Sequence, residues 1–215
     1  MKIEIDNITK KIGSQTVLDC ISLSMESPAI YGLKGRNGSG KTMLMRAICG
    51  LIRLSEGEIR INGEILRKDI SFPRSVGILI ESPGFISHYS AYENLEALIS
   101  IKNIVSRERI TETLEMVGLE PGDKKSFRKF SLGMKQKLGI AAAIIEEPEL
   151  VILDEPTNAL DEQSLERLKK ILGHLKEKGA LVIISCHDTE DLLALSDVII
   201  EMQDGKVISE WKINR

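Results

Sequence analysis

The pattern of hydrophobic and polar positions predicts a protein in which strands and helices alternate along the chain. Strand-like alternation covers residues 2–25 and 58–65 and a terminal hairpin at 198–211, and each is interrupted by a turn sequence. The turns are Gly13-Ser14, Asn62-Gly63 and Asp204-Gly205. Continuous hydrophobic runs are typical of strands buried in a parallel sheet, and they occupy residues 29–33, 76–80, 150–153 and 181–185. We therefore expect an α/β fold with a parallel core sheet and a flanking antiparallel β layer.

Helix signals are concentrated after the break at Ser82-Pro83-Gly84. Ser90 and Glu93 form a capping box ahead of one helix, and Ser106 can cap a second. Ser131 opens a third helix. A further amphipathic helix at 163–178 is shorter than three heptads, so we expect it to pack on the sheet rather than to form a coiled coil.

These elements predict a single domain that covers residues 1–215. Residues 1–81 and 148–215 form its α/β core, and residues 82–147 form an inserted helical lobe.

Composition narrows the class of protein. The chain has 29 basic and 32 acidic residues, and a net charge of −3 provides no basic field for a nucleic-acid partner. No hydrophobic run is long enough to cross a bilayer, and the N-terminus lacks the apolar core of a signal peptide. Cys20, Cys49 and Cys186 are scattered, which favours neither a disulfide framework nor a metal site. We therefore expect a cytosolic protein that does not bind nucleic acid.

One stretch carries clear chemistry, because residues 35–42 fit the phosphate-binding pattern Gly-x4-Gly-Lys-Thr. Its residues are Gly35, Arg36, Asn37, Gly38, Ser39, Gly40, Lys41 and Thr42. The loop lies between a predicted strand and a predicted helix, as the motif requires, so an accidental glycine-rich turn is the weaker interpretation. Backbone N–H groups and the helix N-terminus suit phosphate oxygens. Lys41 can contact the β- and γ-phosphates, and the Thr42 hydroxyl can bind Mg²⁺.

A second element is the carboxylate pair Asp154-Glu155, which ends the hydrophobic strand at 150–153. Ligands gather at the carboxyl ends of parallel strands, so we expect this pair to face the phosphate loop. Asp154 can then hold Mg²⁺, usually through water, and Glu155 can orient or deprotonate the water that attacks the γ-phosphate. A strand end that merely meets solvent is the alternative.

Further motifs make the chain resemble the ATP-binding-cassette (ABC) ATPases over essentially its whole length. Phe130–Leu138 (FSLGMKQKL) is similar to the family's signature motif, and Asp154–Asp161 (DEPTNALD) resembles its magnesium and catalytic motif followed by the D-loop. His187 follows a strand, as the family's switch histidine does. The resemblance implies a P-loop NTPase (RecA-like) core with an antiparallel β layer and an inserted helical lobe.

The resemblance also implies how ATP and Mg²⁺ are used. Ser131 and Gly133 would bind the γ-phosphate held by a second cassette, in a head-to-tail dimer with itself or with a paralogous cassette. His187 would contact the γ-phosphate, and Asp161 would couple the two sites across the interface. Hydrolysis would then loosen the dimer.

Three positions depart from the family pattern. Met43 follows Thr42 where a second hydroxyl residue is common, but Thr42 keeps the metal-ligand role, so we expect little consequence. Glu81 stands where the family usually has a glutamine that contacts Mg²⁺ and the attacking water. Together with the signature form, Glu81 resembles a bacterial subgroup that exports, or protects against, lantibiotics and bacitracin-like peptides. Ile12 replaces the aromatic residue that stacks on adenine, and Val17 is a further expected nucleotide contact.

The function implied is that of an ATP-hydrolysing transporter subunit, cytoplasmic and peripheral on the inner face of the membrane, which drives a separate permease. We expect the permease to contact the segment Glu81–Asn94, where Phe85, Ile86, Tyr89 and Tyr92 are more hydrophobic than a solvated loop requires, although Tyr92 could equally pack inside the helical lobe.

Two other functions are weaker readings of the same motifs. A soluble ABC ATPase acting on ribosomes or DNA is the first alternative, but the chain has neither a second cassette nor a long coiled-coil insertion. A non-hydrolysing switch is disfavoured because Glu155, His187 and Asp161 occur together.

The loss of the stacking aromatic at Ile12 leads to a prediction about base selectivity. Stacking of a base on an aromatic ring contributes about 1–3 kcal/mol, so its absence should weaken discrimination between bases. We expect ATP and GTP to bind with affinities within about tenfold of each other. Competition between the two nucleotides for the purified protein measures the ratio, and a clear preference for ATP would contradict the prediction.

Overall fold

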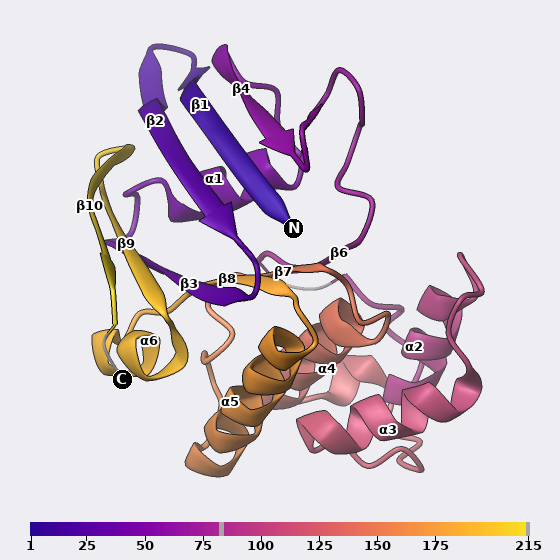
Figure 1. Cartoon of the computed structure of the whole chain (residues 1–215). Helices are drawn as coiled ribbons and strands as arrows, with labels where there is room; N and C mark the ends of the chain where they lie inside the picture. Colours follow the sequence, from indigo (N-terminus) through magenta and orange to yellow (C-terminus); the bar gives the residue numbers. More distant parts are fainter. Residues whose placement is uncertain (82–83, 214–215) are drawn as a thin grey trace.

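The computed structural model describes residues 1–81 and 84–213, so the predicted break at Ser82-Pro83 lies outside the described residues. Figure 1 shows an antiparallel sheet above a central sheet, with most of the helices below. Within these residues the antiparallel sheet has the strand order β2-β1-β4-β5. The strands are β1 (Lys2–Ile12), β2 (Gln15–Glu26), β4 (Glu56–Ile61) and β5 (Glu64–Ile65). The predicted antiparallel layer is therefore present, with β1 and β2 joined at Gly13-Ser14.

The predicted tight hairpin at Asn62-Gly63 is also confirmed. Both residues have a positive φ, 51° and 84°, as the favoured two-residue hairpin turn requires. This turn joins β4 to β5, which pair in antiparallel fashion.

The central sheet contains the predicted parallel strands. In the described part of the chain its order is β10-β9-β3-β8-β7-β6. The strands are β3 (Ala29–Lys34), β6 (Val76–Leu79), β7 (Leu150–Leu153), β8 (Leu181–Ser185), β9 (Val198–Gln203) and β10 (Lys206–Lys212). Strands β9, β3, β8, β7 and β6 run parallel, and β10 turns back on β9 at Asp204-Gly205. The carboxyl ends of the parallel strands therefore lie along one edge of the sheet.

The helices follow the predicted signals with two differences. They are α1 (Lys41–Ile48), α2 (Ala91–Ile99), α3 (Arg107–Val117), α4 (Leu132–Ile144), α5 (Glu162–Glu177) and α6 (Thr189–Leu195), with a 3-10 turn at Phe127–Lys129. Ser90 and Glu93 form the expected capping box on α2, and the Ser131 hydroxyl caps α4. Ser106 occupies the N-cap position of α3, but its side chain makes no cap bond, so that part of the prediction is wrong.

The second difference is α6, which the sequence pattern did not predict. This helix has 7 residues, too few to show a helical period, and it begins where Asp188 accepts hydrogen bonds from the N–H groups of Glu190 and Asp191.

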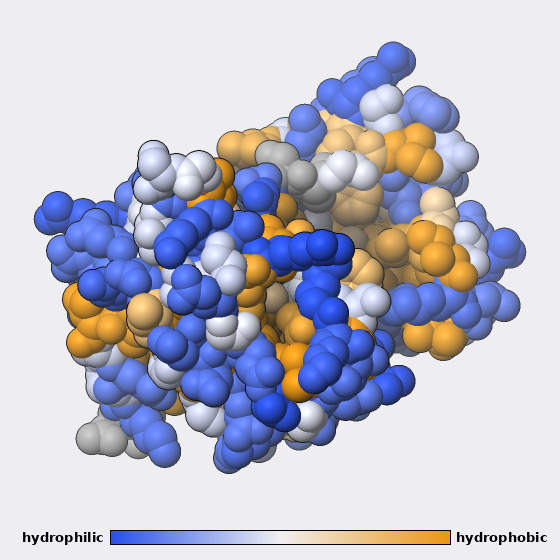
Figure 2. Space-filling model, turned by 90° about the horizontal axis from the view of Figure 1, so that it is seen from above, coloured by the Kyte–Doolittle hydropathy of each residue, from blue (hydrophilic) through white to orange (hydrophobic). Residues whose placement is uncertain are grey.

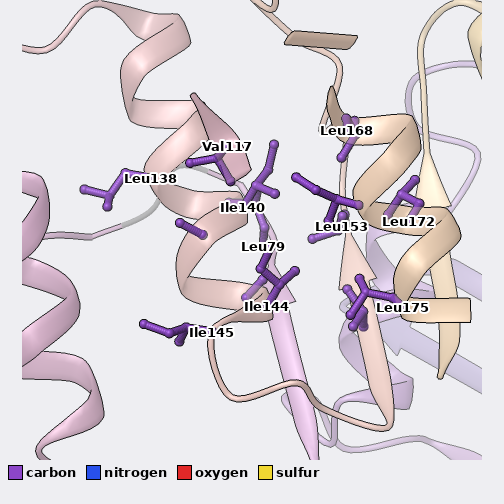
Figure 3. Packing of buried hydrophobic residues seen from close by; sticks show 14 of the residues in the cluster. Leu79, Val117, Leu138, Ile140, Ile144, Ile145, Leu153, Leu168, Leu172 and Leu175 are labelled. Atoms are coloured by element: carbon purple, nitrogen blue, oxygen red, sulfur yellow. The ribbon is translucent and has the colours of Figure 1, made fainter. Parts of the chain in front are cut away.

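Side chains that alternate along the central strands separate two hydrophobic clusters. Leu150 and Ile152 of β7 belong to the cluster shared with α1 and the antiparallel sheet, whereas Val151 and Leu153 belong to the cluster that faces the helices. In Figure 3, Leu79 and Leu153 lie between residues of α4 (Ile140, Ile144) and of α5 (Leu168, Leu172, Leu175). The sheet is thus held by packing on both faces, which makes its edge a rigid platform for a site.

One face of the molecule combines hydrophobic patches with a hollow. Figure 2 shows hydrophobic side chains gathered at the right, over the helical part of the chain, and a hollow between them and the more hydrophilic part at the left. Exposed hydrophobic residues of the helical part include Ile86, Ile101 and Ile104. No helix in residues 1–81 and 84–213 has the length and hydrophobicity needed to span a membrane.

The close approach of β6 to α4 makes Gly77 a sensitive test of the fold. A Cβ atom on Gly77 would overlap the carbonyl group of Ala143, so Gly77→Ala should lower the free energy of unfolding by about 1–3 kcal/mol. Urea denaturation measures the change. The control is Gly173→Ala on α5, where the added Cβ would have no atom within 4 Å apart from the adjoining backbone of its own helix and its two chain neighbours, and there we expect a gain of about 0.5–1 kcal/mol. Equal stabilities of the two variants would contradict this packing.

Candidate nucleotide-binding and catalytic site

The phosphate-binding loop connects β3 to α1 at the edge where the parallel strands end. Gly38 and Gly40 have φ values of 82° and 102°, a left-handed conformation that favours glycine. The Lys41 side chain is buried and its Nζ donates hydrogen bonds to the carbonyl oxygens of Gly35 (2.7 Å) and Arg36 (3.2 Å). A cation and the N-terminus of α1 therefore lie inside one loop, an arrangement that suits phosphate groups.

Hydrogen bonds join this loop to the ends of two other strands through Asp154, the residue that follows β7. The Thr42 hydroxyl donates to Asp154 Oδ2 at 2.6 Å, and the Ser185 hydroxyl donates to Oδ1 at 2.5 Å. A hydroxyl beside a carboxylate is a set of hard oxygen ligands of the kind that Mg²⁺ prefers. No group of three or more His, Cys, Asp or Glu residues in the described chain could hold a metal ion, so phosphate and water oxygens would have to complete the coordination.

Glu155 is held at its backbone and at its side chain. Its φ of 52° is a left-handed conformation that is costly for a residue with a Cβ. Its N–H donates to the Ser185 hydroxyl oxygen (2.9 Å), and its carbonyl oxygen accepts from Gln136 Nε2 (2.9 Å). His187 Nε2 lies 2.8 Å from Glu155 Oε2, and Asn158 Nδ2 donates to the same oxygen at 2.6 Å. The carboxylate is thus fixed in one orientation beside the histidine.

Many of the predicted residues line a single hollow of about 440 Å³. Its lining is Gln15, Val17, Asn37, Gly38, Gly40, Lys41, Thr42, Met43, Glu155 and His187. A second hollow, of about 1070 Å³, shares Asn37, Gly38 and His187 and extends past Gly35 and Ser39 toward β9. The phosphate loop therefore has open space on two sides.

Other predicted residues lie apart from the smaller hollow. Among the described residues that line it, Ile12, Glu81, Ser131, Gly133 and Asp161 are absent. The Ile12 side chain is exposed, and Glu81 is ion-paired with Arg46 of α1 at 2.6 Å.

The three remaining residues lie at the starts of α4 and α5. The Ser131 hydroxyl caps α4, and Gly133 lies in its first turn. Asp161 caps α5, and hydrogen bonds from Ser164 lower the pKa of the Asp161 carboxyl. One chain thus presents its signature residues away from its own phosphate loop.

Ser185 and Gln136 also belong to the site, although the sequence patterns did not predict either residue there. Ser185 is fully buried at the end of β8, and its hydroxyl bridges the Asp154 carboxylate and the Glu155 backbone. The sequence did contain a signal for Ser185, because it is a polar residue at the end of a hydrophobic parallel strand, where ligands gather. Gln136 gave no separate signal, because its bond to Glu155 depends on how α4 packs.

The neighbouring cysteine takes no part in this chemistry. Cys186 is buried between Ser185 and His187, and burial raises the pKa of its thiol to about 12. The thiol therefore stays protonated at neutral pH and is neither a nucleophile nor a metal ligand in this state.

Comparison with known proteins identifies the family. A family profile described as "ABC transporter" matches residues 18–158. The ABC transporter ATP-binding protein YybJ of Bacillus subtilis (strain 168) is 49% identical over 211 residues, which cover 98% of this chain and 97% of that protein. The chain belongs to the ATP-binding proteins of ABC transporters.

Two further relatives carry more specific names. The bacitracin transport ATP-binding protein BcrA of Enterococcus faecalis is 41% identical to this ABC protein, over 99% of this chain and 70% of that protein. The lantibiotic transport ATP-binding protein SrtF of Streptococcus pyogenes is 37% identical, over 97% of this chain and 90% of that protein.

Solved structures agree with this family. An ATP-binding subunit of an ABC transporter has a TM-score of 0.90 and 26% identity, with coverage of 99% of this chain and 90% of that one. The ATP-binding cassette MJ0796, in a dimeric post-hydrolysis state bound to ADP and Pi, has a TM-score of 0.86 and 25% identity over 99% of both chains.

These findings confirm the predicted family, the P-loop NTPase fold class and the prediction that the chain is an ATPase subunit of a transporter. The alternative of a soluble ABC ATPase acting on ribosomes or nucleic acid receives no support from them.

Proposed function

We propose that this ABC ATPase binds ATP with Mg²⁺ between two cassettes and drives a separate membrane permease for export of, or immunity to, antimicrobial peptides. The observation that carries the catalytic part is the cluster in which Thr42, Asp154 and Glu155 meet at the phosphate loop. A metal-ligand pair, a base and a phosphate cradle lie together there, as ATP hydrolysis requires.

The residues of the site have distinct tasks in this proposal. Lys41 and the backbone N–H groups of the loop bind the phosphates, while Thr42 and Asp154 hold Mg²⁺. When bound, Mg²⁺ neutralises charge that develops on the phosphate oxygens. Glu155 takes a proton from the attacking water, and His187, held against Glu155, contacts the γ-phosphate.

The proposed dimer is a head-to-tail pair of this chain or of this chain with a paralogue. Ser131 and Gly133 are at the N-terminus of α4 and do not line the described nucleotide hollow of their own chain. A second cassette placed across the hollow would bring these residues, and a helix N-terminus, to the γ-phosphate. The dimeric form of the cassette MJ0796 supports this arrangement.

The proposed permease contact is the predicted segment Glu81–Asn94, of which residue 81 and residues 84–94 are described, at the cytoplasmic side of the membrane. Of the residues expected there, Phe85 packs edge-on against Phe127 and Tyr92 packs against the helical cluster, so both are structural. Ile86 is 40% exposed and its backbone N–H and C=O are both bonded to the buried side chain of Asn94. Asn94 therefore presents Ile86 to solvent in a fixed position, which suits a docking residue.

The peptide substrate class rests on the relatives named for bacitracin and lantibiotic transport and on Glu81. Deletion of the gene should change sensitivity to a peptide antibiotic of this kind. Unchanged sensitivity and unchanged peptide export would remove the substrate class and leave the transporter assignment in place.

Glu155→Gln tests the catalytic proposal. The amide cannot take a proton from water, so hydrolysis should fall by at least about 100-fold while ATP binding is retained. The trapped dimer should appear on size-exclusion chromatography with ATP and Mg²⁺. Glu162→Gln, the same change on an exposed residue of α5, is the control and should behave as the parent. Hydrolysis by Glu155→Gln at the parental rate would show that another group is the base.

Co-purification tests the transporter proposal. Tagged protein isolated from detergent-solubilised membranes of its source should carry a stoichiometric multi-span protein, identified by mass spectrometry. Ile86→Glu places a charge in the proposed contact and should reduce the yield of that partner at least about fivefold. Leu193→Glu on α6 is the control, since Leu193 is similarly exposed (37%). Capture of soluble partners alone, above all ribosomal proteins or nucleic acid, would refute the transporter proposal.

A further inference from the structure

Asn158 donates a hydrogen bond to Glu155, and the proposed function gives this residue no role. It lies in the turn between Glu155 and α5. Its Nδ2 donates a 2.6 Å hydrogen bond to Glu155 Oε2, and its backbone N–H donates to the Glu155 carbonyl oxygen at 3.2 Å. Side chain and backbone of one residue therefore bind the same glutamate.

The two oxygens of the Glu155 carboxylate have different surroundings. Oε2 receives the Asn158 amide and lies beside His187 Nε2, whereas no protein donor to Oε1 occurs among the described residues. A base that accepts a proton from water needs one oxygen without a competing donor. The amide thus fixes the carboxylate through one oxygen and leaves the other for water.

The turn that carries Asn158 is itself restrained at both ends. Asp161 caps α5 through the N–H of Ser164, and the N–H of Leu160 donates to the carbonyl oxygen of Thr157 at 3.2 Å. On the side of α4, the Ala159 carbonyl oxygen lies 2.7 Å from the position of a Cβ on Gly133. This short distance shows that the turn packs directly against the first turn of α4, with no room for a side chain between them. The packing restrains the turn and so holds Asn158 beside Glu155.

We propose that Asn158 is a positioning residue for hydrolysis, which holds Oε2 of Glu155 so that Oε1 accepts the proton of the attacking water. This inference rests on the proposed role of Glu155 as the base. In the step, the water oxygen forms a bond to the γ-phosphorus, its proton moves to Oε1, and the bond from the γ-phosphorus to the bridging oxygen breaks, with its electron pair leaving on ADP.

The test compares three variants in steady-state hydrolysis and in equilibrium binding of ATP with Mg²⁺. Asn158→Ala removes the donor, and we expect kcat to fall about tenfold or more, with KM and the ATP dissociation constant within about twofold of the parent. Asn158→Asp has the same shape but places a carboxylate against Glu155, so kcat should fall further. Gln163→Ala, which removes a nearby exposed amide on α5, is the control and should keep the parental kcat.

Two readouts separate positioning from a general structural effect. Melting temperatures of the variants should stay within about 2 °C of the parent. The double variant Glu155→Gln with Asn158→Ala should be no slower than Glu155→Gln alone, because both changes act through one carboxylate.

Each other outcome has a definite meaning. If Asn158→Ala keeps the parental kcat while Glu155→Gln is inactive, the inference fails and the proposed function stands. A loss in Asn158→Ala that appears in ATP affinity or melting temperature instead of kcat would show that Asn158 only stabilises the turn, which also overturns the inference. If Glu155→Gln retains the parental rate, the assignment of the base fails first.

Discussion

The site depends on the hydrogen bonds that the Asp154 carboxylate accepts from Thr42 and Ser185. These bonds join Thr42, in the first turn of α1, to residues at the ends of β7 and β8. Helix α1 follows β3 through the phosphate loop, and β3, β8 and β7 are neighbours in the sheet. Hydrogen bonds to a carboxylate are stronger than those between neutral groups, so they fix the start of α1 against the ends of the strands. The Ser185 hydroxyl oxygen also accepts a hydrogen bond from the Glu155 N–H. The same contacts therefore fix the position of the Glu155 backbone.

The packing of the sheet explains why this connection can be precise. Strands β7 and β8 are buried along their whole length, with alternate side chains in the two hydrophobic clusters. A strand that is packed on both faces cannot shift by one residue, because the shift would move each of its side chains into the opposite cluster. The residues that follow β7 and β8 therefore have fixed positions at the edge of the sheet. Helix α4 adds a further constraint, since Gln136 Nε2 donates a hydrogen bond to the Glu155 carbonyl oxygen and so connects α4 to the end of β7.

The sequence was informative where a local pattern determines the structure. The phosphate loop, the hairpin at Asn62-Gly63 and the capping box at Ser90 are each set by residues close together in the chain, and the structure contains all three. Contacts between distant segments were not predictable in the same way. Ser185 lies 31 residues from Asp154, and Gln136 lies 19 residues from Glu155, so only the packed fold shows that they meet.

Local signals also failed in two informative places. Ser106 has the right residue type at an N-cap position, yet its hydroxyl makes no cap bond. Helix α6 is too short for its period to be visible. In both cases the residue type was compatible with more than one local arrangement, and the surrounding structure selected among them.

Glu81 and Glu155 have similar backbone conformations, but their side chains have different partners and different exposure. Both follow a strand of the central sheet and both have a left-handed φ, 60° and 52°. The Glu155 side chain is 27% exposed and is bound by Asn158 and His187, whereas the Glu81 side chain is 63% exposed and is bound by Arg46. An exposed ion pair contributes only about 0–1 kcal/mol, so Glu81 can exchange Arg46 for a metal-bound water at little cost. The pair with Arg46 is therefore compatible with the role expected for Glu81 at the metal, and the difference between the two glutamates lies in how firmly the fold holds each carboxylate.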